Sequence, residues 1–227
     1  MTKRLLVYCE GQTEELIVNR LLRAHLGHHG VLVERRLAAT SLEPGGQRGG
    51  FVNWEAIQFD LRTCFATDQD PNLRFTTLLD VYAMPKAVLA LAGYTAPVSA
   101  VAQVEAVEQA IENVFGEPRF KAYLQRHELE ALVLADTAAL ERVFHRHAAG
   151  IGQLRAEIAS FNNPEDINHG ANTHPAARLE QAIPGYFDLK DANAMQVIAE
   201  AGLDAVRRRC PRFDAWLRTW EQWGLQP

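Results

Sequence analysis

Three short apolar runs, separated by helical patterns, constrain the fold of this chain more than any other feature. They are RLLVYC (residues 4–9), VLVERRLA (31–38) and LRFTTLLDVYAMP (73–85). The first run lacks a helical period, as buried strands of parallel sheets do, and the other two read as strands. Helical patterns lie between them in residues 13–30 and 53–66. This order predicts an α/β fold with a mainly parallel sheet flanked by helices.

Turn and capping residues set the expected ends of these elements. Thr13 is the expected N-cap of the first helix, which Gly30 ends, and Asn53 is the expected N-cap of the second. Residues 41–50 contain four glycines and one proline and therefore predict a loop. A second loop is predicted at residues 86–100.

The second half of the chain becomes mostly helical. Residues 101–115 predict an amphipathic helix, and residues 120–136 a strand followed by a strand or buried helix. We therefore predict an α/β core in residues 1–136 and a helical extension in residues 137–227, packed on the same core as one structural domain. The tail reads as one helix broken at Pro211, with four apolar residues facing the core: Phe213, Trp216, Leu217 and Trp220.

Composition and charge exclude several classes of protein. The chain has 227 residues, 48% of them hydrophobic, which suits one sizeable core. Its net charge of −5 excludes a basic field over the whole protein, so contact with nucleic acid needs a local cationic patch or bridging metal ions. The short basic run at 207–212 offers such a patch, although cations at a helix end explain it more simply.

The cysteines and the lack of long apolar segments indicate a cytoplasmic protein. An odd number of widely spaced cysteines, namely Cys9, Cys64 and Cys210, predicts buried thiols in a reducing compartment. No apolar window approaches the length of a membrane helix, so no membrane association is expected.

Two acids at the ends of predicted strands form the main candidate site. Glu10 ends the first strand and is followed by Gly11, while Asp80 ends the third. Carboxyl ends of parallel strands meet at one edge of a sheet, where carboxylate oxygens suit Mg²⁺ or a pair of such ions. Gly11 would let the backbone approach a phosphate, and Glu14 lies in the first helical turn. The alternative is that these acids only end strands or favour a helix N-terminus.

The segment RHELEAL supplies further candidates. Glu128 and Glu130 share a face only if the segment is extended, and His127 suits a ligand, a general base or a hydrogen-bonded core residue. Arg178 and Lys190 could clamp a phosphate, or they are solvated surface cations.

Histidines elsewhere carry a weaker signal. His28 and His29 lack partnering cysteines or a second histidine pair at a metal-ligand spacing, so we interpret them as ordinary helix-end residues. The common nucleotide, zinc-protease and serine-hydrolase motifs do not occur in the sequence.

Five sequence blocks together resemble a bacterial family. They are VYCEGQTEELIVNRLL, TTLLDVYAMP, LQRHELEALVLAD, PEDIN and CPRFDAWL, and they span about residues 3 to 220. The chain resembles domain of unknown function family 4276, which is similar to the Toprim domains of topoisomerases, primases and OLD-type nucleases. The resemblance implies a compact α/β unit in which a glutamate and a DxD-like pair hold Mg²⁺.

Carried onto this sequence, the resemblance assigns Glu10 to that glutamate and Asp80 to the first acid of the pair. The second acidic position is Tyr82 here, and Glu128 or Glu130 is the candidate for the missing ligand. The family block APSKRL reads HPAARL, which keeps Arg178 and loses the lysine.

Two hypotheses of function follow. The first is a nuclease or related phosphodiester-cleaving enzyme that depends on Mg²⁺ or Mn²⁺ and acts on nucleic acid, with an ATPase partner in bacterial defence implied by the resemblance. Metal would be held by Glu10, Asp80 and Glu128 or Glu130, with Glu14 in support, a proton relayed by His127 and phosphate bound by Gly11, Arg178 and Lys190. The second is a Toprim-like interaction or sensor module without catalysis, which Tyr82 favours. An α/β protein whose acids only cap its elements is the third reading.

Overall fold

The structure, a computed structural model, describes residues 2–38, 53–82, 84–167, 170 and 172–226. The chain forms two compact units. The first contains the residues up to 124 together with those from 219 onward, and the second contains residues 125–218. The boundary predicted between residues 136 and 137 therefore lies within the second unit. The loop predicted at residues 41–50 lies outside the described residues.

A mainly parallel sheet forms the centre of the first unit. β1 (Lys3–Cys9) lies between β2 (Val31–Leu37) and β3 (Leu73–Asp80) and is parallel to both. β3 also pairs in parallel with the short β4 (Phe120–Lys121), and β5 (Leu124–Gln125) pairs with β3. The α/β fold predicted from the order of strands and helices is thus confirmed.

The register of the sheet brings the ends of its three long strands together. Cys9 lies opposite both Leu37 of β2 and Leu78 of β3. Glu10, the residue after β1, and Asp80, the last residue of β3, therefore lie at the same carboxyl edge. The backbone N–H of Glu10 donates to the carbonyl of Leu78 at 3.3 Å, which extends the ladder to this edge.

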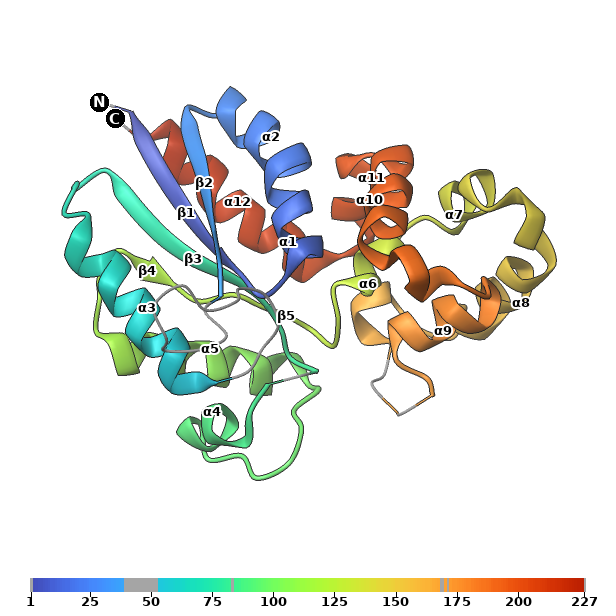
Figure 1. Cartoon of the computed structure of the whole chain (residues 1–227), viewed down its shortest axis with the longest axis horizontal. Helices are drawn as coiled ribbons and strands as arrows, with labels where there is room; N and C mark the ends of the chain where they lie inside the picture. Colours follow the sequence, from blue (N-terminus) through green and yellow to red (C-terminus); the bar gives the residue numbers. More distant parts are fainter. Residues whose placement is uncertain (1, 39–52, 83, 168–169, 171, 227) are drawn as a thin grey trace. The chain divides into compact units, whose positions relative to one another are not determined.

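Helices cover one face of the sheet through an aromatic-rich core. α3 (Trp54–Thr67), α4 (Lys86–Leu91) and α5 (Val101–Phe115) lie on this side (Figure 1). Edge-to-face ring contacts link Phe65 to Phe75 of β3 at 4.9 Å between centroids. Tyr8 of β1 belongs to the same buried cluster.

Two local predictions on this side have different outcomes. Asn53 caps α3 as predicted, because its side chain accepts hydrogen bonds from Glu55 N at 2.8 Å and Ala56 N at 3.4 Å. The loop predicted at residues 86–100 is wrong in its first half, where α4 forms. Pro85 stands just before that helix with φ near −59°, and the sequence KAVLAL that follows favours a helix.

The other face of the sheet is covered by the N-terminal helical segment and the last turns of α12 (Pro211–Leu225) (Figure 1). That segment comprises α1 (Gln12–Ile17), a π-helical stretch (Val18–Leu22) and α2 (Arg23–His28). The N-cap is Gly11, so the prediction of Thr13 is wrong: the helix begins earlier. Lys3 binds the end of α12, since its Nζ donates to the carbonyl of Trp223 at 2.7 Å.

The second unit is helical, as predicted for the C-terminal part. The predicted break at Pro211 is confirmed, as is the burial of Phe213, Trp216, Leu217 and Trp220. Its helices, in chain order, are α6 (Glu130–Val133), α7 (Thr137–Val143), α8 (Ala148–Ile158), α9 (Pro175–Ala182), α10 (Lys190–Ala201), α11 (Leu203–Arg209) and the first half of α12.

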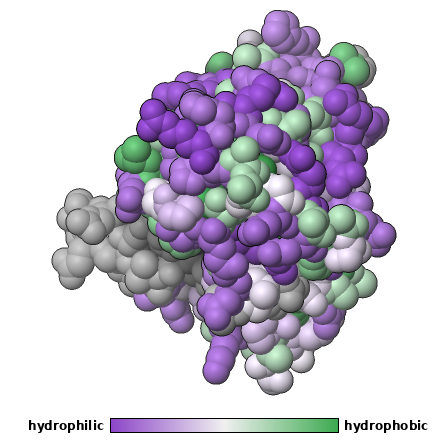
Figure 2. Space-filling model, turned by 90° about the vertical axis from the view of Figure 1, so that its right-hand side faces the viewer, coloured by the Kyte–Doolittle hydropathy of each residue, from purple (hydrophilic) through white to green (hydrophobic). Residues whose placement is uncertain are grey.

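The three cysteines are buried, as the sequence analysis predicted. Cys9, Cys64 and Cys210 are all buried, and none forms a disulfide. Figure 2 shows one face of the molecule, on which hydrophilic residues predominate and hydrophobic ones are scattered in small groups. Among the residues that the structure describes, no helix is both long and apolar enough to span a lipid bilayer.

Candidate functional site

The side chain of Glu10 lies across the end of the neighbouring strand. Its Oε2 accepts a hydrogen bond from the backbone N–H of Asp80 at 3.1 Å. The two residues are distant in sequence, and the parallel register of β1 and β3 brings them together. Both residues are partly buried, although Oδ1 of Asp80 is itself buried, and the contact between them runs from the Asp80 backbone to the Glu10 side chain.

Glu14, in the first turn of α1, adds a third carboxylate close in sequence to Glu10. Its Oε2 accepts the backbone N–H of Gly11 at 2.8 Å, although the side chain is buried. Gly11 leaves room for this contact, because a Cβ at that position would lie 3.3 Å from Oε2 and the carboxylate would have to shift slightly. Burial raises the pKa of the Cys9 thiol, and the neighbouring Glu14 raises it further.

These carboxylates are suited to a hard cation that keeps much of its water. Mg²⁺ prefers oxygen ligands and is commonly held by one or two carboxylates, with water and phosphate completing the shell. A carboxylate has about four acceptor positions, and each hydrogen bond described above uses one of them. The three acids do not form a closed cage, because among the described residues only His25, His29 and Glu221 bring three potential ligand atoms within 4.8 Å of one another.

In the second unit, Glu128 forms a pair with a histidine that the sequence analysis did not single out. Glu128 Oε2 lies 2.9 Å from Nδ1 of His174 and accepts the backbone N–H of Ala176 at 3.0 Å. The carboxylate thereby closes the N-terminus of α9, where an anion is favourable. The only sequence signal was the His-Pro pair at the helix start, since Pro175 occupies the first helical position.

Glu130 is more deeply buried and has different partners. Its side chain is 1% exposed, and its Oε1 lies 2.9 Å from Nζ of Lys190. Burial raises the pKa of Glu130, the charge of Lys190 lowers it, and that of Glu128 raises it again. Burial likewise raises the pKa of the Tyr186 hydroxyl, with Glu130 as the next cause. Glu128 and Glu130 therefore diverge, as expected outside an extended strand, yet they influence each other electrostatically.

His127, between β5 and α6, has an unusual backbone conformation. Its φ is +64°, and it is the one non-glycine residue with positive φ in the described part of the chain. Its side chain is buried. Histidine tolerates this conformation better than most residues, but it is still costly and frequently marks functional positions.

The cations predicted to bind phosphate both contact acids of the second unit. Lys190 pairs with Glu130, as described above. Arg178 donates to the carbonyl of Thr173 at 2.7 Å and to Oε2 of Glu157 at 3.1 Å, and its guanidinium lies over the ring of Phe161. These contacts hold Arg178 against the polar loop that precedes α9.

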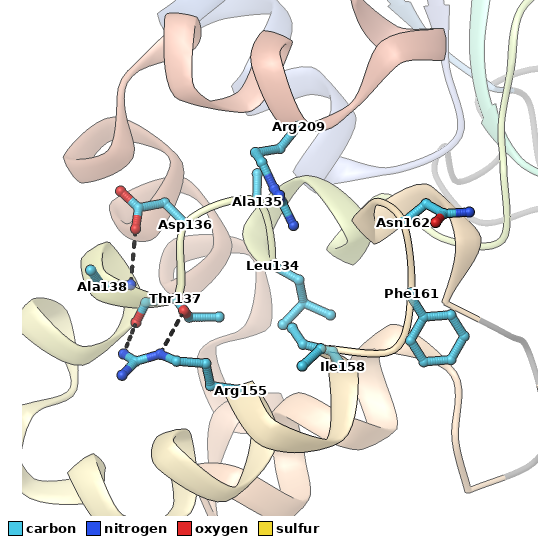
Figure 3. A pocket seen from close by; sticks show the side chains of 11 residues that line it. Leu134, Ala135, Asp136, Thr137, Ala138, Arg155, Ile158, Phe161, Asn162 and Arg209 are labelled. Carbon is cyan, nitrogen blue, oxygen red and sulfur yellow. Dashed lines mark hydrogen bonds between the residues drawn. The ribbon is translucent and has the colours of Figure 1, made fainter.

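A pocket of about 370 Å³ lies elsewhere in the second unit (Figure 3). On one wall, Arg155 donates to Oγ1 of Thr137 at 2.9 Å, and Asp136 accepts the backbone N–H of Ala138 at 2.9 Å. Arg209 reaches toward the pocket from another side (Figure 3). The contacts of Asp136 fix the start of α7, and none of the residues predicted for the site lines this pocket.

Comparison with known families gives one result. A family model described as Domain of unknown function (DUF4276) matches residues 9–221. The chain belongs to this family. The DUF4276 match begins at the last residue of β1, so it includes the carboxyl edge with Glu10 and Asp80 as well as Glu128 and Glu130 of the second unit. No curated protein and no solved structure matches the chain.

Proposed function

We propose that this DUF4276 protein is a Toprim-like, metal-dependent enzyme that cleaves phosphodiester bonds, with its chemistry at the carboxyl edge of the first unit. The observation that carries the proposal is the hydrogen bond from Asp80 N to Glu10 Oε2, which holds the acid of β1 beside that of β3. The likeness to Toprim domains assigns Glu10 to their glutamate and Asp80 to the first acid of their DxD-like pair, while Tyr82 stands at the second position. The same likeness supports a bacterial defence role with an ATPase partner.

The residues of the edge would position a cation. Mg²⁺ or Mn²⁺, when bound, would polarise a phosphoryl oxygen and activate a water molecule. Glu10 and Asp80 supply carboxylate oxygens for it, and the amide of Asp80 orients Glu10. Glu14 keeps negative charge near the site, oriented by the amide of Gly11. Because that amide already binds Glu14, we propose that phosphate is recognised mainly through the cation.

The deciding experiment compares cleavage by wild type, Glu10→Gln and Asp80→Asn. Each protein is incubated with a panel of single- and double-stranded DNA and RNA, with Mg²⁺ or with Mn²⁺. We expect the wild type to cut at least one substrate and both variants to lose that activity, because each loses an anionic ligand while keeping its size. Circular dichroism checks that the variants fold.

Glu55→Gln is the matched control, since Glu55 is an exposed acid in the first turn of α3. It should cleave as the wild type does. Equal cleavage by all four proteins would refute the proposal. The roles predicted for His127, Glu128 and Glu130 stay predictions, and Glu128→Gln in the same assay tests one of them.

Tyr82 favours the second candidate function, an interaction or sensor module without catalysis. It occupies the position of the second acid, and the residue is 43% exposed. An exposed aromatic residue beside the acids suits contact with a partner better than it suits metal binding. Calorimetric titration with Mg²⁺ and Mn²⁺ separates the two functions, because a module without catalysis should show no binding below about millimolar metal.

A further inference from the structure

Two histidines and a glutamate from opposite ends of the chain meet in the first unit. His25 lies in α2 and His29 is the C-cap residue of that helix, four positions later. This spacing places both rings on one side of the helix, with their centroids 5.0 Å apart. Glu221, in the last part of α12, faces them both.

The distances among the three side chains suit a shared ion. Nε2 of His25 lies 2.5 Å from Oε1 of Glu221, and Nε2 of His29 lies 3.9 Å from the same oxygen. All three potential ligand atoms lie within 4.8 Å of one another. Ligands of a tetrahedral zinc ion are about 3.3 Å apart, so small side-chain rotations would bring these atoms to that spacing.

The backbone around the three residues is tightly packed, which fixes the positions of the two helices. Gly224 lies one helical turn after Glu221, and a Cβ there would come within 2.2 Å of the carbonyl oxygen of His29. Gly30 follows His29 with φ of +78°, a conformation that turns the chain sharply from α2 into β2. Lys3 binds the carbonyl of Trp223 on the same turn. Helix positions set by such contacts limit how far the ligands must move.

The exposure and chemistry of the group distinguish it from the carboxyl edge. The side chains of His25, His29 and Glu221 are 24%, 31% and 13% exposed, so an ion could enter and keep a water molecule as a fourth ligand. Two imidazoles with one carboxylate suit zinc and similar transition metals, whereas Mg²⁺ prefers oxygen alone.

We propose that His25, His29 and Glu221 form a binding site for a Zn²⁺-class divalent ion that links α2 to α12. The site is separate from the proposed Mg²⁺ chemistry and does not depend on it. His29 lies at the end of α2, as the sequence analysis interpreted it, and the proposal adds a role as a metal ligand. His25 became significant only when its contact with Glu221 was known, because 196 positions separate the two residues in sequence.

The test titrates Zn²⁺ into the full-length, metal-stripped protein by calorimetry and follows Co²⁺ binding by visible absorption. We expect one ion per chain with a dissociation constant on the order of 1 μM or lower, unaffected by excess Mg²⁺. Zn²⁺ should also raise the melting temperature, because it binds the folded chain.

Two variants and one control decide the outcome. Glu221→Gln can still hydrogen-bond to His25 but loses the anionic ligand, so Zn²⁺ affinity should fall at least tenfold while the fold is kept. His29→Gln, at the helix end, should do the same. His28→Ala, an exposed neighbour that is not part of the group, should bind Zn²⁺ as the wild type does.

The opposite results would overturn the proposal. If the wild type binds no stoichiometric Zn²⁺, or if both variants bind it as tightly as the wild type, the group is only a hydrogen-bonded contact between helices. Circular dichroism of each variant separates loss of the ligand from loss of the fold.

Discussion

The carboxylate of Glu165 accepts a hydrogen bond from the backbone N–H of Arg212 at 2.8 Å. Its other oxygen accepts the N–H of Phe213 at 3.1 Å, so one buried side chain closes the N-terminus of α12. The PEDIN and CPRFDAWL blocks are thereby joined within the second unit. Burial raises the pKa of Glu165, and these two backbone bonds lower it. For this acid, the contacts indicate a structural role.

Glu165→Ala should therefore destabilise the fold. The side chain is 1% exposed, and its removal leaves two backbone N–H groups without their acceptor. The N–H of Phe213 is buried and that of Arg212 is only partly buried. An unsatisfied buried donor costs about 1–3 kcal/mol and a partly exposed one costs less, so the free energy of unfolding should fall by about 2–4 kcal/mol in urea denaturation. Asp204→Ala is the control, because Asp204 is also an acid in a first helical turn but is exposed, and it should change stability by about 0.5 kcal/mol or less.

Glu130 should make stability depend on pH with a defined sign. Its folded-state pKa is raised above the ordinary value of 4.5, mainly by burial. The folded state therefore favours the protonated carboxyl. The stability that this preference contributes is fully present below the unfolded-state pKa and is lost as pH rises through the folded-state pKa. Glu130→Gln cannot ionise and keeps a similar volume.

The measurement is the free energy of unfolding of wild type and Glu130→Gln in urea from about pH 5 to pH 8. As pH rises, the free energy of unfolding of the variant should increase relative to that of the wild type, because only the wild type must ionise a buried acid. The loss of the contact with Lys190 opposes this gain at the upper end. Parallel profiles at every pH would contradict the raised pKa.

The strands and the shared edge were predictable because they depend on local pattern. Burial on both faces of β1 gives a continuous apolar run, and parallel strands end at one edge whatever connects them. That rule alone placed Glu10 near Asp80. The cap of α3 was equally local, since Asn53 binds amides two and three residues away.

Most of the remaining features depend on contacts between residues that are distant in sequence. Nothing near Glu128 indicates His174, which is 46 positions away. The two-unit division was equally hidden, because the last residues of α12 return to the first unit. The start of the first helix at Gly11 depends on the reach of the Glu14 side chain, which a search for a polar N-cap does not detect.

Gly11→Ala should disturb the carboxyl edge without straining the backbone. Gly11 has φ of −144° and ψ of −165°, an extended conformation that alanine adopts readily. The added Cβ would lie 3.3 Å from Glu14 Oε2, so the carboxylate must shift. If Glu14 supports the proposed cation site, Mn²⁺ affinity and cleavage should fall about tenfold while stability changes by about 1 kcal/mol or less. An unchanged Mn²⁺ affinity would argue against a role for Glu14.

Two glycines in α8 offer a matched test of helix packing in the second unit. A Cβ on Gly150 would lie 2.3 Å from the carbonyl oxygen of Ala182, the last residue of α9, whereas a Cβ on Gly152 would meet nothing within 4 Å. Gly150→Ala should therefore force α8 away from α9 and lower the free energy of unfolding by about 1–3 kcal/mol. Gly152→Ala should raise it by about 0.5–1 kcal/mol, because alanine favours a helix over glycine. Urea denaturation of both variants measures these changes. If both substitutions changed the free energy of unfolding by the same amount, the close approach of α8 to α9 would not be needed for stability.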